Sequence, residues 1–345
     1  MKLCASFAFL EVLTLCHAGI LLNLTGGLVV EKQHAISDRE CYVAYNQNNT
    51  AGESHFCYPS VVVAGFPKCG TSFMFKTLAG HPSLRATRRK EMCLGGVKSE
   101  TWEAFLSHLA VDISPASADS MQRTLSGCLH TGANIEAART LAVTKTKYIF
   151  VVRHVADMLW AAYNYWCIPA LDSYCKPGQR TTKLHRRSPE GFHNRVMAGL
   201  PMGGGIPMGP EGNCFKPSLK RAISLFGKDN IIVVRSEDLL PTLNKELRLS
   251  HLRTLLSSLH LDSPADFETS YLSANVLVNS GYSLEKRGEF VSTPVSGVWK
   301  NNVYEISKYK PMLEITRQLL EDRWKHEQRW LKKNFEIEYP PVNTL

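Results

Sequence analysis

The segment Gly65-Phe66-Pro67-Lys68-Cys69-Gly70-Thr71-Ser72 has the residue types and spacing of an anion-binding turn. A β-branched run at 61–64 precedes it, and an apolar stretch typical of a helix, 72–79, follows it. A strand, a glycine-containing turn and a helix amino terminus together present backbone N–H groups to phosphate or sulfate. We therefore predict an anion site whose binding residues are Lys68, Cys69, Gly70, Thr71 and Ser72.

The same turn departs from the loop that binds nucleoside triphosphates. In the pattern G-x-x-x-x-G-K-[ST], Gly65 and Gly70 are in place, but Thr71 stands where the lysine is required. An ATPase or a kinase is therefore disfavoured. The lysine of this turn is instead Lys68, two residues before Gly70.

Apolar runs predict the elements that position this turn. The runs at 61–64, 148–152 and 231–234 are continuous, as in strands buried on both faces of a parallel sheet. Helical stretches lie between them, so we expect a P-loop-like, three-layer α/β fold with a central parallel sheet flanked by helices. Segment 311–335 predicts a docking helix with a structural role, from the spacing of Met312, Ile315, Leu319, Leu320, Trp324 and Trp330.

In this strand–turn–helix context, the order Pro-Lys-x-Gly-Thr-Ser at 67–72 resembles the 5′-phosphosulfate loop of the sulfotransferase family. Members of that family use 3′-phosphoadenosine 5′-phosphosulfate (PAPS) as the co-substrate. The resemblance implies that Lys68 is catalytic and reaches the oxygen bridging phosphate and sulfur, where negative charge grows as the bond breaks. It covers about 61–345, strongly in the first third and loosely after Pro169, and is closest to lumenal, Golgi-type carbohydrate and heparan-sulfate sulfotransferases.

A basic run ending in a carboxylate follows the predicted helix, at Arg88-Arg89-Lys90-Glu91. It is similar to the Lys-Glu pair of the lumenal sulfotransferases, whose glutamate is the general base. The resemblance implies that Glu91 takes the proton of the acceptor hydroxyl while Lys90 holds substrate anions nearby. Taken alone, a glutamate in a basic run is more often a solvated surface residue.

Two further segments resemble the family's 3′-phosphate site. Arg153 follows the run at 148–152 and matches the family arginine, but Ala161 stands where the family has a serine, which removes one hydroxyl donor. Another segment, Lys286-Arg287-Gly288, is similar to a 3′-phosphate element of the cytosolic members, although its spacing to Trp299 differs. The strand end at 231–239 also matches, and we expect it to be structural.

The resemblance implies an in-line displacement at sulfur. Glu91 takes the hydroxyl proton, and Lys68 stabilises the departing 3′,5′-bisphosphate. No metal is expected, since no acidic cluster in the sequence resembles a magnesium site.

A segment at 169–217, rich in glycine and proline, interrupts the α/β pattern. Inserted loops of this length are usually functional or disordered. Two interpretations stay open: a solvated loop, or one wall of an acceptor groove for an acidic glycan, lined by Arg180, Lys183, Arg186, Arg187 and Arg195. The formal net charge of +9 agrees with an anionic partner, and no nucleic-acid-binding signature accompanies it.

The amino-terminal segment 3–30 lacks Lys, Arg and Asp and is typical of a targeting segment. One interpretation is a signal peptide cleaved near Ala18, and the other is an uncleaved anchor that makes a single-pass type II membrane protein. Glu11 inside a spanning helix costs about 2.5 to 3.5 kcal/mol, which mildly favours the cleaved form. Either form directs the chain to the secretory-pathway lumen, with the Golgi as the expected location.

The expected organisation is therefore a signal peptide or signal-anchor at 1–30, a polar lumenal stem at 31–56 and a sulfotransferase domain at 57–345. The sequon at Asn48 lies in the stem, where glycosylation is expected. Of the ten cysteines, eight follow the targeting segment, and an even number in an oxidising lumen favours disulfides.

The cysteine spacing leaves the disulfide connectivity open. The pairs that close short loops, Cys41 with Cys57 and Cys167 with Cys175, are the first to test. Buried free thiols explain Cys93 and Cys128 equally well, and no pairing is expected in particular for Cys69 and Cys214.

Three alternatives to a carbohydrate sulfotransferase stay open. The acceptor hydroxyl could belong to a tyrosine or a small alcohol, because the acceptor pocket has no sequence signature. A sulfotransferase-like protein weakened at Ala161 could only hold polyanions, although the retention of Lys68 and Glu91 argues against this. A kinase that binds ATP with magnesium would use the same kind of turn, and Thr71 argues against it.

Overall fold

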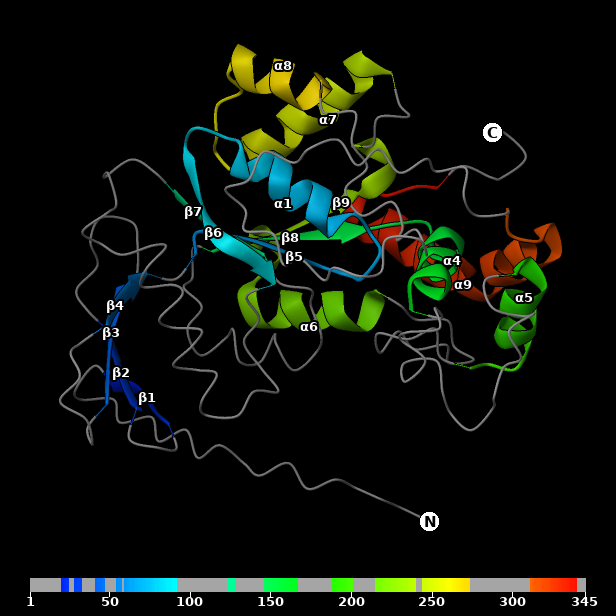
Figure 1. The fold of residues 1–345 in the computed structure, drawn as a ribbon, viewed down its shortest axis with the longest axis horizontal. Coiled ribbons are helices and arrows are strands. Elements are labelled where there is room, and N and C mark those ends of the chain that lie inside the picture. Colours follow the sequence, from blue (N-terminus) through cyan, green and yellow to red (C-terminus); the bar gives the residue numbers. More distant parts are fainter. Residues whose placement is uncertain are drawn as a thin grey trace, which may run out of the picture.

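A computed structural model of the chain describes residues 20–24, 28–32, 41–46, 54–57, 59–91, 123–127, 146–166, 188–200, 215–239, 244–273 and 311–339. These residues form two sheets, a small antiparallel one near the amino terminus and a larger parallel one that lies among the helices (Figure 1). The larger sheet carries the turn at 65–72 that is predicted to bind an anion.

The larger sheet has five parallel strands in the order β6-β7-β5-β8-β9. In chain order the strands are β5 (Val61–Gly65), β6 (Leu84–Glu91), β7 (Arg123–Gly127), β8 (Lys147–Val152) and β9 (Ile231–Arg235). The central strands β5 and β8 are almost wholly buried, because their apolar residues face helices on both sides of the sheet. The predicted α/β fold with a central parallel sheet is confirmed, and β5, β8 and β9 lie at the predicted apolar runs.

Helices lie on both faces of this sheet. In chain order they are α1 (Thr71–Ala79), α4 (Val155–Trp166), α5 (Pro189–Met197), α6 (Lys216–Phe226), α7 (Lys245–Ser258), α8 (Ala265–Ser273) and α9 (Glu314–Phe335). In Figure 1, α1, α7 and α8 lie on one side of the sheet and α6 lies on the other. This arrangement gives the three layers expected from the sequence.

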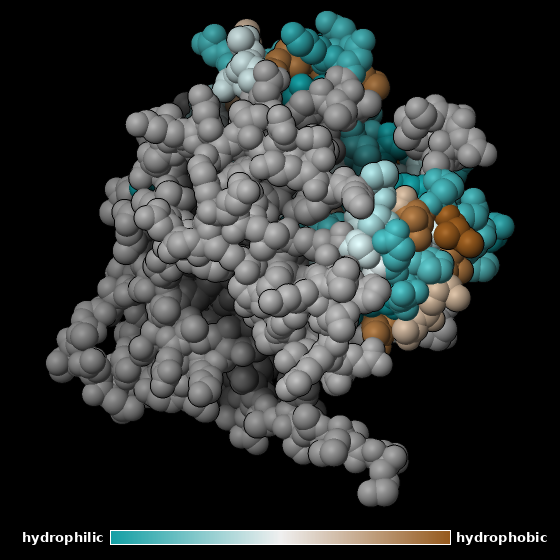
Figure 2. All heavy atoms as spheres, turned by 45° about the vertical axis from the view of Figure 1, so that its right-hand side comes forward, coloured by the Kyte–Doolittle hydropathy of each residue, from teal (hydrophilic) through white to brown (hydrophobic). Residues whose placement is uncertain are grey.

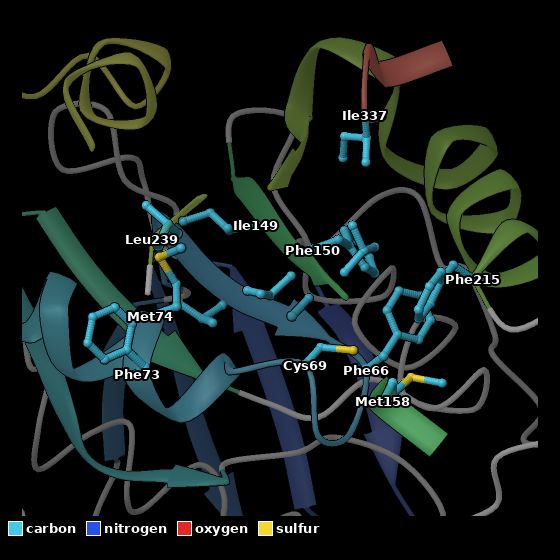
Figure 3. Close-up of a cluster of buried hydrophobic side chains, with 14 of the residues drawn as sticks. Phe66, Cys69, Phe73, Met74, Ile149, Phe150, Met158, Phe215, Leu239 and Ile337 are labelled. Carbon is cyan, nitrogen blue, oxygen red and sulfur yellow. The ribbon is translucent and has the colours of Figure 1, made fainter. Parts of the chain in front are cut away.

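The core is centred on β8. Neither Ile149 nor Phe150 is exposed, and Tyr148 stacks on Phe226 of α6 with 4.2 Å between ring centroids. Figure 3 shows Phe150 in the same cluster as Phe66, the residue that follows β5. Burying one side chain of this size contributes about 1.5–3 kcal/mol. Apolar packing therefore fixes the strand ends from which the polar site residues extend.

The predicted docking helix is confirmed as α9, with Leu320, Trp324 and Leu331 buried. Two polar contacts join it to other helices. Arg317 donates to Asp157 of α4 over 2.7 Å, and Glu327 accepts the backbone N–H groups of Phe215 and Lys216, at 2.6 and 2.7 Å, where α6 begins. The helix therefore connects α4 with the start of α6, two segments of the chain between β8 and β9.

One residue of the predicted apolar stripe of α9 is exposed. Ile315, in the first turn, is 68% exposed, and Met197 at the end of α5 is 61% exposed. Figure 2 turns this side of the molecule forward and shows hydrophobic residues scattered among hydrophilic ones. The predicted apolar position in the first turn of α9 is therefore exposed, whereas Leu320, Trp324 and Leu331 further along the helix are buried.

The described residues within the expected targeting segment (1–30) and stem (31–56), together with Cys57, form the small sheet. Its strands, β1 (Ile20–Leu24), β2 (Leu28–Lys32), β3 (Cys41–Asn46) and β4 (Ser54–Cys57), pair antiparallel in chain order. Part of the expected targeting segment and part of the expected stem are therefore paired strands. The apolar and β-branched residues of β1 and β2, and the aromatic residues of β3 and β4, are of types that favour strands. None of the helices in the described part of the chain has the length and apolar character needed to cross a membrane.

The glycine- and proline-rich segment at 169–217 is not a loop throughout. It contains α5, which Ser188 caps by accepting the N–H of Gly191 over 2.9 Å, with Pro189 at the first helical position. Serine followed by proline is a helix start signal, but it was not recognised in a segment rich in glycine and proline. Residues 169–187 and 201–214 lie outside the described residues.

Candidate anion-binding site

The predicted turn lies between β5 and α1 and uses left-handed backbone at three positions. Gly65, Lys68 and Gly70 have φ angles of 131°, 64° and 88°. A Cβ atom at Gly65 would lie 2.9 Å from the backbone nitrogen of Val151, so the close approach of the turn to β8 requires glycine there. Gly70 occupies the cap of α1 and has no side chain to accept from the helix N–H groups. The turn thus has the backbone of an anion site.

The parallel sheet brings several strand ends to this turn. The carboxyl ends of parallel strands meet at one edge of a sheet, where α/β folds commonly bind ligands. The residues after β8 and β9 lie at the same edge as the turn: Arg153 Nη1 donates to the Lys68 carbonyl oxygen over 3.2 Å, and a Cβ at Gly70 would contact Ser236 at 3.4 Å. Lys68 and Arg153, predicted from distant segments, are therefore brought together.

Positive charge accumulates around Lys68. Burial, together with the charges of Arg153 and Lys90, lowers the pKa of Lys68 from 10.5 to about 8. Desolvation and like charges both disfavour a protonated amine, whereas a bound anion would offset both effects. The arrangement is therefore suited to a multiply charged anion such as a phosphate or a sulfate.

Lys90 comes from β6, the edge strand. This strand pairs with β7, where Glu91 is opposite Gly127, and a Cβ atom at Gly127 would lie 2.9 Å from the Lys90 side chain. The close packing explains why glycine ends β7. The backbone of Glu91, the predicted general base, is therefore at the same sheet edge as the turn, while its side chain lies outside the described part of the structure.

Glu237 is a residue of this site for which the sequence indicated only a structural role. It lies in the 3-10 helix η5 (Ser236–Asp238) after β9, and its carboxylate accepts the N–H of His154 over 2.9 Å. Burial raises the pKa of Glu237, despite this hydrogen bond and the nearby charge of Arg153. The contact holds the backbone at His154, the residue that follows Arg153.

The side chains of the turn divide between the site and the core. Cys69 is unexposed, and Figure 3 shows its sulfur among apolar side chains near Phe66. Burial raises the pKa of its thiol, which therefore stays protonated. Thr71 is also buried, and its methyl group would contact a Cβ at Gly65. The Cys69 side chain therefore belongs to the core, and only the backbone of this residue is available for an anion.

The described carboxyl-terminal segment packs against the end of β9, which the sequence did not predict. Arg235 bonds to Asp238 and to the carbonyl oxygen of Glu338. The Tyr339 ring meets His154 edge-on at 5.4 Å, and the Arg235 guanidinium lies 5.8 Å from the same ring. These contacts support the loops that carry Arg153 and Glu237. They join residues far apart in the sequence, so no local motif could have revealed them.

Other predicted residues stand apart from this cluster. Arg195, expected in a solvent-facing acceptor groove, is only 8% exposed, because it packs within the buried face of α5. Ala161 lies within α4 and supplies no hydroxyl. Several predicted binding residues fall outside the described part of the chain, namely Arg180, Lys183, Arg186, Arg187, Lys286, Arg287 and Gly288.

No known family model and no curated protein sequence matches the chain. Among solved structures, a mouse sulfotransferase complexed with PAP is 11% identical, with 81% of this chain and 88% of that chain covered and a TM-score of 0.48. A sulfotransferase from Alicyclobacillus acidocaldarius is 14% identical, covering 63% of this chain and 95% of that one, with a TM-score of 0.38. Retinol dehydratase in complex with androsterone and inactive cofactor PAP is 11% identical, covering 94% and 100%, with a TM-score of 0.36. At these identities and TM-scores, none of them assigns a role to a residue of this chain.

Proposed function

We propose that this chain is a sulfotransferase that moves a sulfonate group from PAPS to a hydroxyl of a carbohydrate acceptor. The observation that carries the proposal is the convergence of Lys68, Lys90 and Arg153 on a glycine turn at the carboxyl edge of a parallel sheet. Such a site fits a nucleotide with phosphates at two positions. Thr71, in the place of the lysine that nucleoside triphosphates require, argues against ATP as the donor.

In the proposed reaction, the acceptor oxygen forms a bond to sulfur as the bond between sulfur and the bridging phosphate oxygen breaks. Lys68 stabilises the negative charge that develops on that oxygen, and 3′,5′-adenosine bisphosphate (PAP) leaves. Glu91 takes the proton of the acceptor hydroxyl. Arg153 binds the 3′-phosphate, with Lys286, Arg287 and Gly288 as further candidates from the sequence.

A carbohydrate is the proposed acceptor class, and the support for it is the sequence. The basic positions Arg180, Lys183, Arg186 and Arg187 would complement an acidic or already sulfated glycan. The proposed location is the Golgi or secretory-pathway lumen, supported by the apolar stretch at 3–19, which lacks Lys, Arg and Asp, and by the sequon at Asn48. Polysaccharide sulfation in this compartment would also agree with the basic net charge.

Transfer of radiolabelled sulfonate from PAPS to a panel of native and desulfated polysaccharides tests the proposal. We expect label on at least one polysaccharide with the native protein and with Lys325→Ala, a control at an exposed lysine of α9. We expect none with Lys68→Ala. If label appears only on peptides or small alcohols, the carbohydrate assignment is wrong. If PAP binds but no polysaccharide is labelled, the acceptor is of another kind, and if PAP does not bind either, a polyanion-binding protein becomes the better explanation.

A further inference from the structure

The small amino-terminal sheet places two cysteines directly opposite each other. Strands β3 and β4 pair antiparallel, and the register matches Cys41 with Cys57. Cys41 is the first residue of β3 and Cys57 is the last residue of β4. The two cysteines are therefore the end pair of this hairpin, at the side away from its connecting loop.

This register meets the distance requirement of a disulfide. Directly opposite residues of an antiparallel pair have Cα atoms about 4.5 or about 5.5 Å apart, depending on the hydrogen-bonding position. Cystines span Cα distances of about 4.4–6.8 Å. Both possible positions lie within that range, so the strands need not move for the two sulfurs to bond.

The chain after Cys57 is anchored in the central sheet. The Thr146 hydroxyl donates to the carbonyl oxygen of Pro59 over 3.0 Å, and the N–H of Ser60 donates to Thr124 over 3.0 Å. A covalent bond at Cys57 would therefore connect β3 to the point where the chain enters the core. The bond would restrict the chain on both sides of the loop between β3 and β4, which are six and four residues long.

We infer that Cys41 and Cys57 form a disulfide that closes the β3–β4 hairpin. The inference is independent of the proposed transferase activity. Two thiols lose two electrons and two protons to a disulfide oxidant such as oxidised glutathione, which leaves as two thiols, and one S–S bond forms. The bond stabilises the sheet chiefly by restricting the unfolded chain between Cys41 and Cys57.

Peptide mapping of the folded full-length protein tests this pairing. The protein is equilibrated with oxidised glutathione, alkylated after unfolding but without reduction, and digested with trypsin. Residues 40–68 form one tryptic peptide that contains both cysteines, because no Lys or Arg lies between Arg39 and Lys68. We expect this peptide to be unalkylated and two hydrogen masses lighter than its reduced form. After cleavage at Glu53, its two parts should stay joined until reduction.

Cys69 gives an internal control, because its buried free thiol should be alkylated once the protein is unfolded. Alkylation of both Cys41 and Cys57, or a link from either one to a different cysteine, overturns the inference. As an independent measurement, Cys41→Ala, Cys57→Ala and the double variant should all lower the melting temperature equally, by about 5 °C. Additive losses in the double variant would contradict a shared bond.

Discussion

At the scale of single residues, the site depends on a lysine that is costly to keep charged. The pKa of Lys68 falls to about 8 because of burial first, and then because of Arg153 and Lys90. An anion that binds against these three cations removes much of that cost. Protonation of Lys68 and anion binding are therefore coupled, and each favours the other.

Binding of PAP should weaken as the pH rises above 8. In the free protein Lys68 loses its proton near pH 8, whereas the bound anion raises its pKa, so binding above pH 8 requires proton uptake. Affinity should be constant between pH 7 and 8 and then fall by up to about tenfold per pH unit. Calorimetric titration between pH 7 and 10 measures this dependence.

Lys68→Met is the control for this pH dependence, since it should bind PAP more weakly and lack the alkaline loss. Burial also lowers the pKa of Lys76 to about 8. Any dependence of the affinity on pH that remains in Lys68→Met would therefore be assigned to Lys76. A native protein whose affinity does not change up to pH 10 would exclude Lys68 from direct contact with the anion.

Glu237 should act through hydrogen bonding to the backbone next to Arg153. Glu237→Ala leaves the His154 N–H without its acceptor and should weaken PAP binding about tenfold, since a hydrogen bond to a charged group is worth about 1.5–3 kcal/mol. Glu237→Gln keeps an acceptor oxygen and should retain most of the affinity. Equal losses in the two variants would show that the charge of Glu237, rather than its hydrogen bond, matters.

At the scale of elements, α9 supports the site from a distance. Its Glu327 carboxylate binds two backbone N–H groups where α6 begins, and α6 covers the face of the sheet that carries Tyr148. Arg317 of the same helix binds Asp157 of α4, the helix that follows Arg153. Burial alone would raise the pKa of Asp157, but the hydrogen bond and charge of Arg317 outweigh it and keep that pKa below its usual value.

Glu327→Ala should lower the free energy of unfolding by about 3 kcal/mol, because it leaves one buried and one partly buried N–H group at the start of α6 without their acceptor. Glu327→Gln, which keeps one acceptor, should cost about 1 kcal/mol. Urea unfolding measures both values. Asp322→Ala, at an exposed position of α9, is the matched control, and a loss in Glu327→Ala no larger than in this control would contradict the capping role.

The sequence predicts some elements well and misses others for physical reasons. Strands β5, β8 and β9 follow from continuous apolar runs, since burial on both faces selects such residues. β6 is an edge strand with a polar sequence, and β7 buries the hydroxyls of Thr124 and Ser126, so neither strand has a hydrophobic signal. From the sequence, Lys90 could therefore be assigned to the site only by resemblance. The structure brings it close to Lys68, because it lies at the carboxyl end of β6.

At the scale of the whole molecule, parallel topology assembles the site from distant segments. The turn after β5 is recognisable locally, because its glycines and its lysine are adjacent in the sequence. The contacts of Arg153, Glu237 and Tyr339 depend on the strand order and on the path of the carboxyl terminus, which no local pattern encodes. The small sheet was missed because β1 and β2 lie in an apolar stretch that was interpreted as a targeting segment, and β3 and β4 lie in a polar region.

The central claim is that the turn at 65–72, together with Arg153, binds the bisphosphate nucleotide of a sulfonate donor. Calorimetric titration of the full chain at pH 7.5 with PAP, with ADP, and with ATP plus magnesium tests it most directly. We predict that PAP binds most tightly, that ADP, which lacks the 3′-phosphate, binds more weakly, and that Lys68→Ala loses about 10- to 100-fold in affinity for PAP. Tighter binding of ATP with magnesium, or an unchanged affinity in Lys68→Ala, would contradict the assignment.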